Sequence, residues 1–196
     1  MDERVQRIVQ SATMLAEEGG FEAVRLRDVA AHAQVALGTL YRRFPSKEAI
    51  LVAALDFETA RLEERLGKSQ GKTPLLGGPR ERVVALFGRL TAAMCRKPNL
   101  SRAILRSVVT GSPELADRAT AFHRRMTDLV TAVLRAPGVA TPTEEDAERT
   151  RKIALVLQQT WFAGLVGWMG GMYSQNEVLE QVNIAAELIL GGAERP

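Results

Sequence analysis

The sequence predicts an all-α protein in which an N-terminal helix-turn-helix domain of three helices is joined by a long helix to a C-terminal helical domain. Apolar residues recur at helical spacing along almost the whole chain, whereas long alternating β-branched runs are absent. Glycine and proline divide these helical stretches at intervals. With 196 residues, of which 46% are hydrophobic, the chain is long enough to form a hydrophobic core.

The first helix is predicted to begin at the cap Asp2 and to stop at Gly19-Gly20. Two short helices follow, at 27–33 and 37–43, on either side of the corner Ala33-Gln34-Val35-Ala36. These elements form a predicted domain 1–47. Residues predicted to point into its core are Val29, Ala30, Leu40, Phe44 and Ile50.

A fourth helix is predicted to connect the two domains over 46–66. Pro45 ends the helix before it, and Ser46 can cap its first turn. The segment 67–79, rich in glycine and proline, is predicted to be a linker. The second domain then occupies 80–196, and its predicted helices cover 80–97, 99–110, 113–135, 143–170 and 175–190.

Charge is unevenly distributed, although the net charge is only +3. Residues 1–68 hold ten basic residues against eleven acidic ones, yet within 25–47 five basic residues face one aspartate. The single cysteine, Cys95, excludes an internal disulfide framework, and the two histidines lie far apart in sequence, so no metal site and no cofactor are expected. The N-terminus lacks the pattern of a secretory signal, so we expect a cytoplasmic protein.

The segment 25–47, RLRDVAAHAQVALGTLYRRFPSK, has the residue order of a DNA-reading helix-turn-helix. A helix that begins Leu37-Gly38-Thr39 can approach base edges closely, because Gly38 adds no bulk and Thr39 offers a hydroxyl and a methyl group. The basic residues around this helix can bind the phosphates of the DNA backbone. The predicted DNA-binding residues are Arg25, Arg27, Leu37, Gly38, Thr39, Tyr41, Arg42, Arg43 and Lys47.

These residues resemble the tetracycline-repressor (TetR) family of bacterial transcription regulators. The matching positions are Gly20-Phe21-Glu22-Ala23, Arg27-Asp28-Val29-Ala30, Gly38-Thr39-Leu40-Tyr41 and Phe44-Pro45-Ser46-Lys47-Glu48. The amino-acid sequence of this segment is similar to that of actinobacterial repressors of sterol catabolism. The resemblance implies a homodimer that binds a palindromic double-stranded DNA operator, with half-sites about one helical turn apart.

Two positions depart from the family pattern. Gln34 stands where the family usually has glycine, so the corner must form without glycine's conformational freedom. Ala36 stands where serine is usual, which removes a helix cap worth about 1 kcal/mol. We therefore expect a slightly strained or differently shaped corner.

Residues 153–176 contain no charge. The length admits a membrane span, but Gln158, Gln159 and Thr160 together with four glycines argue against one, so no membrane partner is expected. A helix buried on two sides explains the run instead, and the burial could be in a dimer or in an intrachain core. In the family the last two helices form the dimer interface, which maps here onto Ala163, Gly167, Gly171, Val178, Val182, Ala185, Leu188 and Ile189.

The family also encloses a ligand pocket within its inner helices. Large apolar residues that could line it are Leu86, Leu90, Met94, Phe122, Met126, Trp161, Phe162 and Trp168, although such residues are more often simple core. None of these side chains is ionisable, so the expected effector is a hydrophobic small molecule, steroid-like or fatty-acyl. Basic residues are frequent in 79–135, and we call this region the basic belt. Its side chains could either be solvated or bind the phosphates of a coenzyme A thioester. The belt includes Arg96, Lys97, Arg102, Arg106, Arg124 and Arg125.

An enzyme is not expected, since the sequence lacks a nucleophile elbow, a phosphate-binding glycine loop followed by lysine, and a zinc-protease motif. The sequence instead predicts a ligand-responsive repressor, released from DNA by a hydrophobic effector. A DNA-binding architectural or interaction protein without an effector is the alternative.

Overall fold

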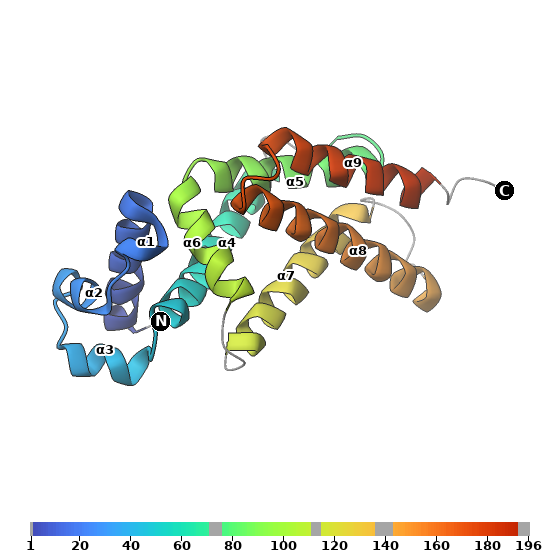
Figure 1. Ribbon diagram of the computed structural model, residues 1–196. Helices are drawn as coiled ribbons and strands as arrows, with labels where there is room; N and C mark the ends of the chain where they lie inside the picture. Colours follow the sequence, from blue (N-terminus) through green and yellow to red (C-terminus); the bar gives the residue numbers. More distant parts are fainter. Residues whose placement is uncertain (1, 71–75, 111–114, 136–142, 192–196) are drawn as a thin grey trace. The chain divides into compact units, whose positions relative to one another are not determined.

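The computed structural model describes residues 2–70, 76–110, 115–135 and 143–191, and all regular secondary structure within these ranges is helical. The helices, labelled in Figure 1, are α1 (Glu3–Ala23), α2 (Leu26–His32), α3 (Leu37–Arg43), α4 (Lys47–Gln70), α5 (Pro79–Cys95), α6 (Pro98–Val109), α7 (Ala116–Leu134), α8 (Glu144–Met169) and α9 (Gln175–Gly191). The prediction of an all-α fold is confirmed.

The helices form two compact units. The first comprises residues 1–68 and 96–120, and the second comprises residues 69–95 and 121–196. Helix α6 therefore belongs with the N-terminal elements, whereas the sequence suggested a division at a single linker. Helix α4 also runs to Gln70, so the first residues of the predicted linker 67–79 are helical; residues 71–75 lie outside the described ranges.

In the first unit, α1 packs on α6 and on α2, and α2 packs on α3 (Figure 1). Asp2 caps α1 by accepting a hydrogen bond from the Arg4 amide. The first helix was predicted to stop at Gly19-Gly20; the backbone is kinked at these two glycines, but α1 continues to Ala23. Ser46 accepts a hydrogen bond from the Ala49 amide at 3.2 Å, which confirms it as a cap of α4. The residues expected in the core are all buried there: Val29, Ala30, Leu40, Phe44 and Ile50.

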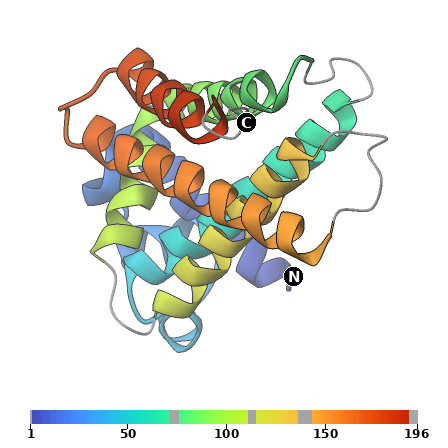
Figure 2. The ribbon, with the colours of Figure 1, turned by 90° about the vertical axis from the view of Figure 1, so that its right-hand side faces the viewer.

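In the second unit, α9 packs against both α5 and α8. Figure 2 shows α8 and α9, in orange and red, lying side by side along their lengths. Gly164 permits this approach, because a Cβ there would meet the Val178 side chain at 3.1 Å. No helix among the described residues is long and apolar enough to cross a membrane. The uncharged run of α8 instead buries one side, made of Leu157, Trp161, Leu165 and Trp168.

Candidate functional site

Helix α3 exposes the surface that the sequence assigned to DNA. Tyr41 is 50% exposed, and Arg42 and Arg43 are also exposed. A Cβ built on the exposed Gly38 meets nothing within 4 Å. Packing inside the protein therefore does not require a glycine at this position. Leu37 differs from the rest, since it is half-buried against the core.

Polar groups on α3 are held close to one another. The Arg42 guanidinium donates to the Thr39 hydroxyl at 3.4 Å, one helical turn away. Arg25, Arg27 and Arg43 are exposed, and their guanidinium groups have no hydrogen-bond or ion-pair partner among the described residues. These three arginines can therefore meet phosphates without breaking an existing contact.

Lys47 was predicted to contact a phosphate, but its ammonium group is engaged within the protein. Its Nζ donates to the Phe21 carbonyl at 3.1 Å, pairs with Glu22 at 3.3 Å and lies 3.8 Å from the centre of the Phe21 ring. The side chain is only 24% exposed. Lys47 thus joins the start of α4 to the end of α1, and would reach a phosphate only by giving up part of this arrangement.

The corner between α2 and α3 is built around Gln34. Its φ of 54° makes it the only residue besides glycine with a positive φ in the described part of the chain. The Val35 amide donates to the Ala30 carbonyl and the Gln34 amide to the Ala31 carbonyl, which is the Schellman pattern of a helix C-terminus. A left-handed conformation costs a residue other than glycine about 1–2 kcal/mol, so the expected strain is present.

The missing cap at α3 is also confirmed. Ala36 occupies the N-cap position and provides no side-chain hydrogen bond. The first amides of α3 are therefore satisfied by fewer protein groups than in a helix capped by serine.

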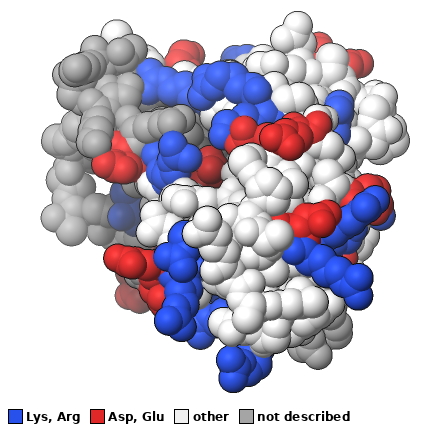
Figure 3. Space-filling model, turned by 90° about the vertical axis from the view of Figure 1, so that its left-hand side faces the viewer, with Lys and Arg blue, Asp and Glu red and all other residues white. Residues whose placement is uncertain are grey.

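On the face shown in Figure 3, basic side chains form separate groups rather than one continuous surface. Figure 3 shows lysine and arginine, in blue, divided by uncharged and acidic side chains on the face that it presents. Within residues 25–47, the arginines without a partner are the three at positions 25, 27 and 43. The unpaired positive charge of this segment therefore lies at the end of α3 and the start of α2.

The predicted pocket residues all belong to the second unit. Leu86, Leu90, Met126 and Trp161 are buried, as is Trp168, whereas Met94, Phe122 and Phe162 are partly exposed. The Trp161 ring lies 5.2 Å from that of Phe87, and its indole N–H donates to Thr91 at 2.9 Å. The structure thus brings helices α5 and α8 together through these apolar residues.

Two polar residues to which the sequence assigned no role in the site, Gln158 and His123, lie among these apolar residues. Gln158 is 0% exposed and its amide nitrogen lies 2.8 Å from Nδ1 of His123. The His123 ring packs edge-on against Phe162 and against Phe122. The signal that could have found Gln158 was its position at helical spacing with Trp161 and Leu165 on an otherwise apolar face.

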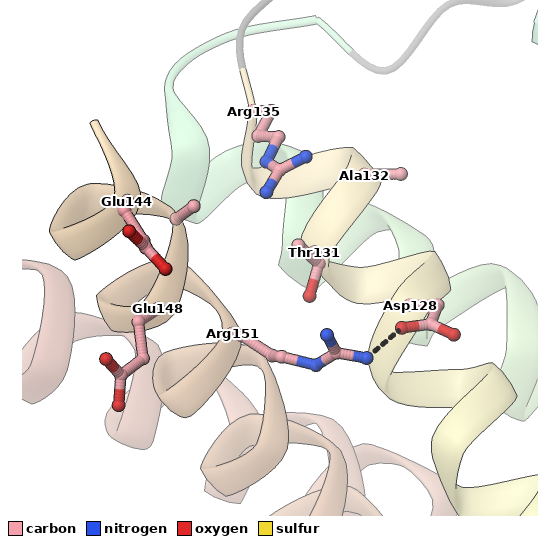
Figure 4. A pocket seen from close by; sticks show the side chains of 8 residues that line it. Asp128, Thr131, Ala132, Arg135, Glu144, Glu148 and Arg151 are labelled. Atoms are coloured by element: carbon pink, nitrogen blue, oxygen red, sulfur yellow. Dashed lines mark hydrogen bonds and ion pairs between the residues drawn. The ribbon is translucent and has the colours of Figure 1, made fainter. Parts of the chain in front are cut away.

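A polar hollow of about 480 Å³ opens between α7 and α8 (Figure 4). Arg151 points across it and pairs with Asp128 at 3.0 Å. Because acidic and basic groups alternate around it, this hollow does not select a charge. Its lining residues are Asp128, Thr131, Ala132, Arg135, Glu144, Ala147, Glu148 and Arg151.

The basic belt of 79–135 is divided between the two units, and several of its members are engaged within the protein. Lys97 pairs with Glu17, and Arg106 pairs with Glu22 at 3.0 Å. Arg102 and Arg125 also have partners within the chain. Arg96, Lys97, Arg102 and Arg106 lie in the first unit, whereas Arg124 and Arg125 lie in the second.

The predicted dimer residues fall into two groups. Ala163, Gly171 and Leu188 are exposed, and Ala185 and Ile189 are partly exposed. By contrast, Val178 and Val182 are fully buried within the chain, and Gly167 is filled by Tyr173, whose ring lies 2.2 Å from the place of a Cβ. These last three cannot contact a second subunit while this packing holds. Further exposed apolar side chains lie on the same two helices: Leu155, Val156 and Ile184.

Residues 8–54 match the family model described as bacterial regulatory proteins of the tetR family, and residues 77–189 match that of the tetracycline repressor-like C-terminal domain. The transcriptional repressor KstR of Rhodococcus jostii is 36% identical over 195 residues, covering 99% of this chain and 86% of that protein. KstR of Mycobacterium tuberculosis is 33% identical, covering 96% and 81%.

Solved structures agree. A TetR transcriptional regulator from Rhodococcus superposes with a TM-score of 0.74 at 28% identity, covering 96% of this chain and 95% of that one. FadR of Thermus thermophilus, solved with lauroyl-CoA, has a TM-score of 0.72 at 22% identity, covering 98% and 96%. At this low identity, the similarity to FadR shows only that the two proteins share a fold. Since both halves match and the repressors align over nearly the whole chain, this protein belongs to the TetR family of transcriptional regulators, which are not enzymes.

Proposed function

We propose that the protein is a repressor that binds a palindromic operator as a homodimer through α3 and is released by a hydrophobic effector. The observation that carries the proposal is the exposed face of α3, where Gly38 and Thr39 share a short helix with Arg42, which bonds Thr39, and with the exposed Arg43, which has no partner among the described residues. The relatives named above are themselves called transcriptional repressors. Such a regulator acts on the chromosome, so we place it in the cytoplasm.

The division of labour on this face follows from side-chain chemistry. Gly38 and Thr39 at the start of α3 are small enough to approach base edges. Tyr41, Arg42 and Arg43 then contact the phosphates, together with Arg25 and Arg27. Lys47 holds α1 and α4 together beneath this surface.

The effector is proposed to be a steroid-like or fatty-acyl molecule, including a coenzyme A thioester. The interior of the second unit supplies large apolar side chains, notably Leu86, Trp161 and Phe162. The fold is known to occur with acyl chains, since FadR of Bacillus subtilis was solved with stearoyl-CoA and that of Thermus with lauroyl-CoA. An effector needs different affinities for two protein arrangements, and a coupling of about 1–3 kcal/mol changes operator affinity roughly 5–150-fold.

The test measures binding of the full chain to a labelled duplex from the DNA upstream of its own coding sequence. Arg43→Ala should weaken binding and reduce the slope of log K against log salt by about 1. Arg149→Ala, at an exposed arginine of α8, is the matched control and should change neither. Equal effects of the two substitutions would contradict the assignment of α3 as the DNA-reading helix.

Effector release is measured in the same assay with cholesterol, stearoyl-CoA and lauroyl-CoA. Release by at least one of them is expected. Tight, sequence-selective binding that no hydrophobic ligand changes would instead favour an architectural DNA-binding protein. Absence of sequence-selective binding would refute the operator proposal itself.

A further inference from the structure

Gln158 presents an unsatisfied polar atom inside an apolar part of the second unit. The residue is 0% exposed, and its Oε1 has no hydrogen-bond partner. Within the described residues of this unit, it is the only buried side-chain nitrogen or oxygen in that condition. Buried polar groups are nearly always paired, and leaving one unpaired destabilises the fold, so this atom needs an explanation.

Other polar side chains in the same interior are satisfied. Thr91 donates to the Phe87 carbonyl and accepts from the Trp161 indole. Thr127 and Thr131 each donate to the carbonyl one turn earlier in α7. These buried hydroxyl groups therefore all have hydrogen-bond partners, and the amide oxygen of Gln158 is the exception.

The hydrogen-bonding neighbour of Gln158 is the imidazole of His123, and this imidazole packs against an aromatic ring. His123 holds the amide nitrogen at 2.8 Å, and Phe162 packs edge-on against that imidazole at 4.7 Å. His123 and Phe162 are both partly exposed, whereas Gln158 is sealed. The histidine thus pairs with the amide nitrogen and leaves the amide oxygen without a hydrogen-bond partner.

We propose that Gln158 is the specificity-determining residue of the effector site, and that it selects a hydrophobic molecule carrying a hydroxyl group. This inference rests on the proposed effector function. A hydroxyl group donates to Oε1, and it would equally accept from the amide nitrogen if the amide were turned around, so it suits either orientation. A hydrocarbon at the same place would leave the amide unpaired, which is how buried polar groups reject apolar analogues.

The test uses two pairs of probes that differ by one hydroxyl group: cholesterol with cholest-5-ene, and 12-hydroxystearoyl-CoA with stearoyl-CoA. Binding is measured on the full chain by calorimetry and by release of operator DNA. In the unsubstituted protein, the hydroxylated member of at least one pair should bind at least tenfold more tightly. Gln158→Met should remove this preference while it retains binding of the apolar member.

Gln159→Met is the matched control, because Gln159 is the exposed neighbour of Gln158 in α8. It should leave the preference unchanged. Without ligand, Gln158→Met should unfold at a temperature no lower than Gln159→Met, since it removes an unpaired group and His123 can reach water.

Three results would overturn the inference. These are the absence of a hydroxyl preference in both pairs, a preference that survives Gln158→Met, and a marked loss of stability in Gln158→Met, which would make the residue part of the core. If some probe releases the operator but none shows the preference, the effector function stands without this inference. If no probe binds, both fail.

Discussion

Lys47 lies with its ammonium group 3.8 Å from the centre of the Phe21 ring, while Arg106 lies 4.0 Å from the same ring. Glu22 pairs with both cations, at 3.3 Å and 3.0 Å. The dipeptide Phe21-Glu22 at the end of α1 therefore contacts both the start of α4 and the last turn of α6. This contact fixes how α4 leaves the helix-turn-helix.

The first prediction concerns the pH dependence of this contact. The hydrogen bond and charge of Lys47, followed by those of Arg106, hold the pKa of Glu22 below its usual 4.5. Stabilisation by Glu22 is therefore fully present above pH 4.5 and is lost as the pH falls through the lowered pKa of the folded state. Glu22→Gln should lower the unfolding free energy at pH 7, and the difference should shrink in acid. Chemical denaturation at both pH values measures it.

Glu18→Gln is the control, because Glu18 is an exposed carboxylate of the same helix without an ion pair among the described residues. It should leave the unfolding free energy nearly unchanged at pH 7. If Glu22→Gln were equally neutral at pH 7, Glu22 would contribute nothing to holding α4 and α6.

The second prediction separates folding from DNA binding at Gly38. A Cβ there meets nothing within 4 Å, so Gly38→Ala should raise the unfolding free energy, by up to about 1 kcal/mol. If α3 approaches base edges at this point, the same change should weaken operator binding. Gly88→Ala in α5, where a Cβ is also free of contacts, should stabilise the fold and leave DNA binding intact. Unchanged operator affinity in Gly38→Ala would place the base edges elsewhere.

The third prediction concerns the corner at Gln34. Gln34→Gly removes the penalty of a φ of 54° and adds entropy to the unfolded chain, so a net stabilisation of up to about 1 kcal/mol is expected. Thermal and denaturant unfolding measure it. A loss of stability would show that the glutamine side chain holds the corner through contacts that outweigh its strain.

This corner also shows how far sequence reasoning reached. The caps Asp2 and Ser46, the core of the helix-turn-helix and the exposed face of α3 depend on neighbours close in sequence, and all were predicted correctly. Local propensity and helical period are sufficient for such features.

The features that sequence reasoning missed depend on partners distant in the chain. Nothing near Lys47 in sequence indicates that Phe21 and Glu22 engage it, and His123 lies 35 positions from its partner Gln158. Arg82 was likewise read only as part of a basic region, yet it is buried and donates to the carbonyls of Val133 and Leu134 at the end of α7. Pairings of this kind are set by tertiary packing.

The fourth prediction tests why α8 needs a glycine at position 167. A Cβ there would lie 2.2 Å from the Tyr173 ring, so Gly167→Ala must displace that ring from the turn between α8 and α9. Overpacking of this kind costs about 1–3 kcal/mol. Gly88→Ala, with the same chemical change in an uncrowded helix, should be stabilising instead. If both substitutions behaved alike, Tyr173 would not occupy this place in solution, and Gly167 would again be available to a partner helix.

The fifth prediction tests the proposed dimer. Because Val178 and Val182 are buried within the chain, a second subunit must be met by the apolar residues that α8 and α9 leave outside, among which Leu188 is 73% exposed. A charge at this site would be desolvated in the dimer and hydrated in the monomer, so Leu188→Asp should shift sedimentation toward the monomer without lowering helix content. Val109→Asp, at a 50% exposed apolar residue of α6, should leave the association unchanged. Because both half-sites of a palindrome must be bound together, Leu188→Asp should also weaken operator binding with α3 intact, whereas a variant that still sediments as a dimer would place the interface on another surface.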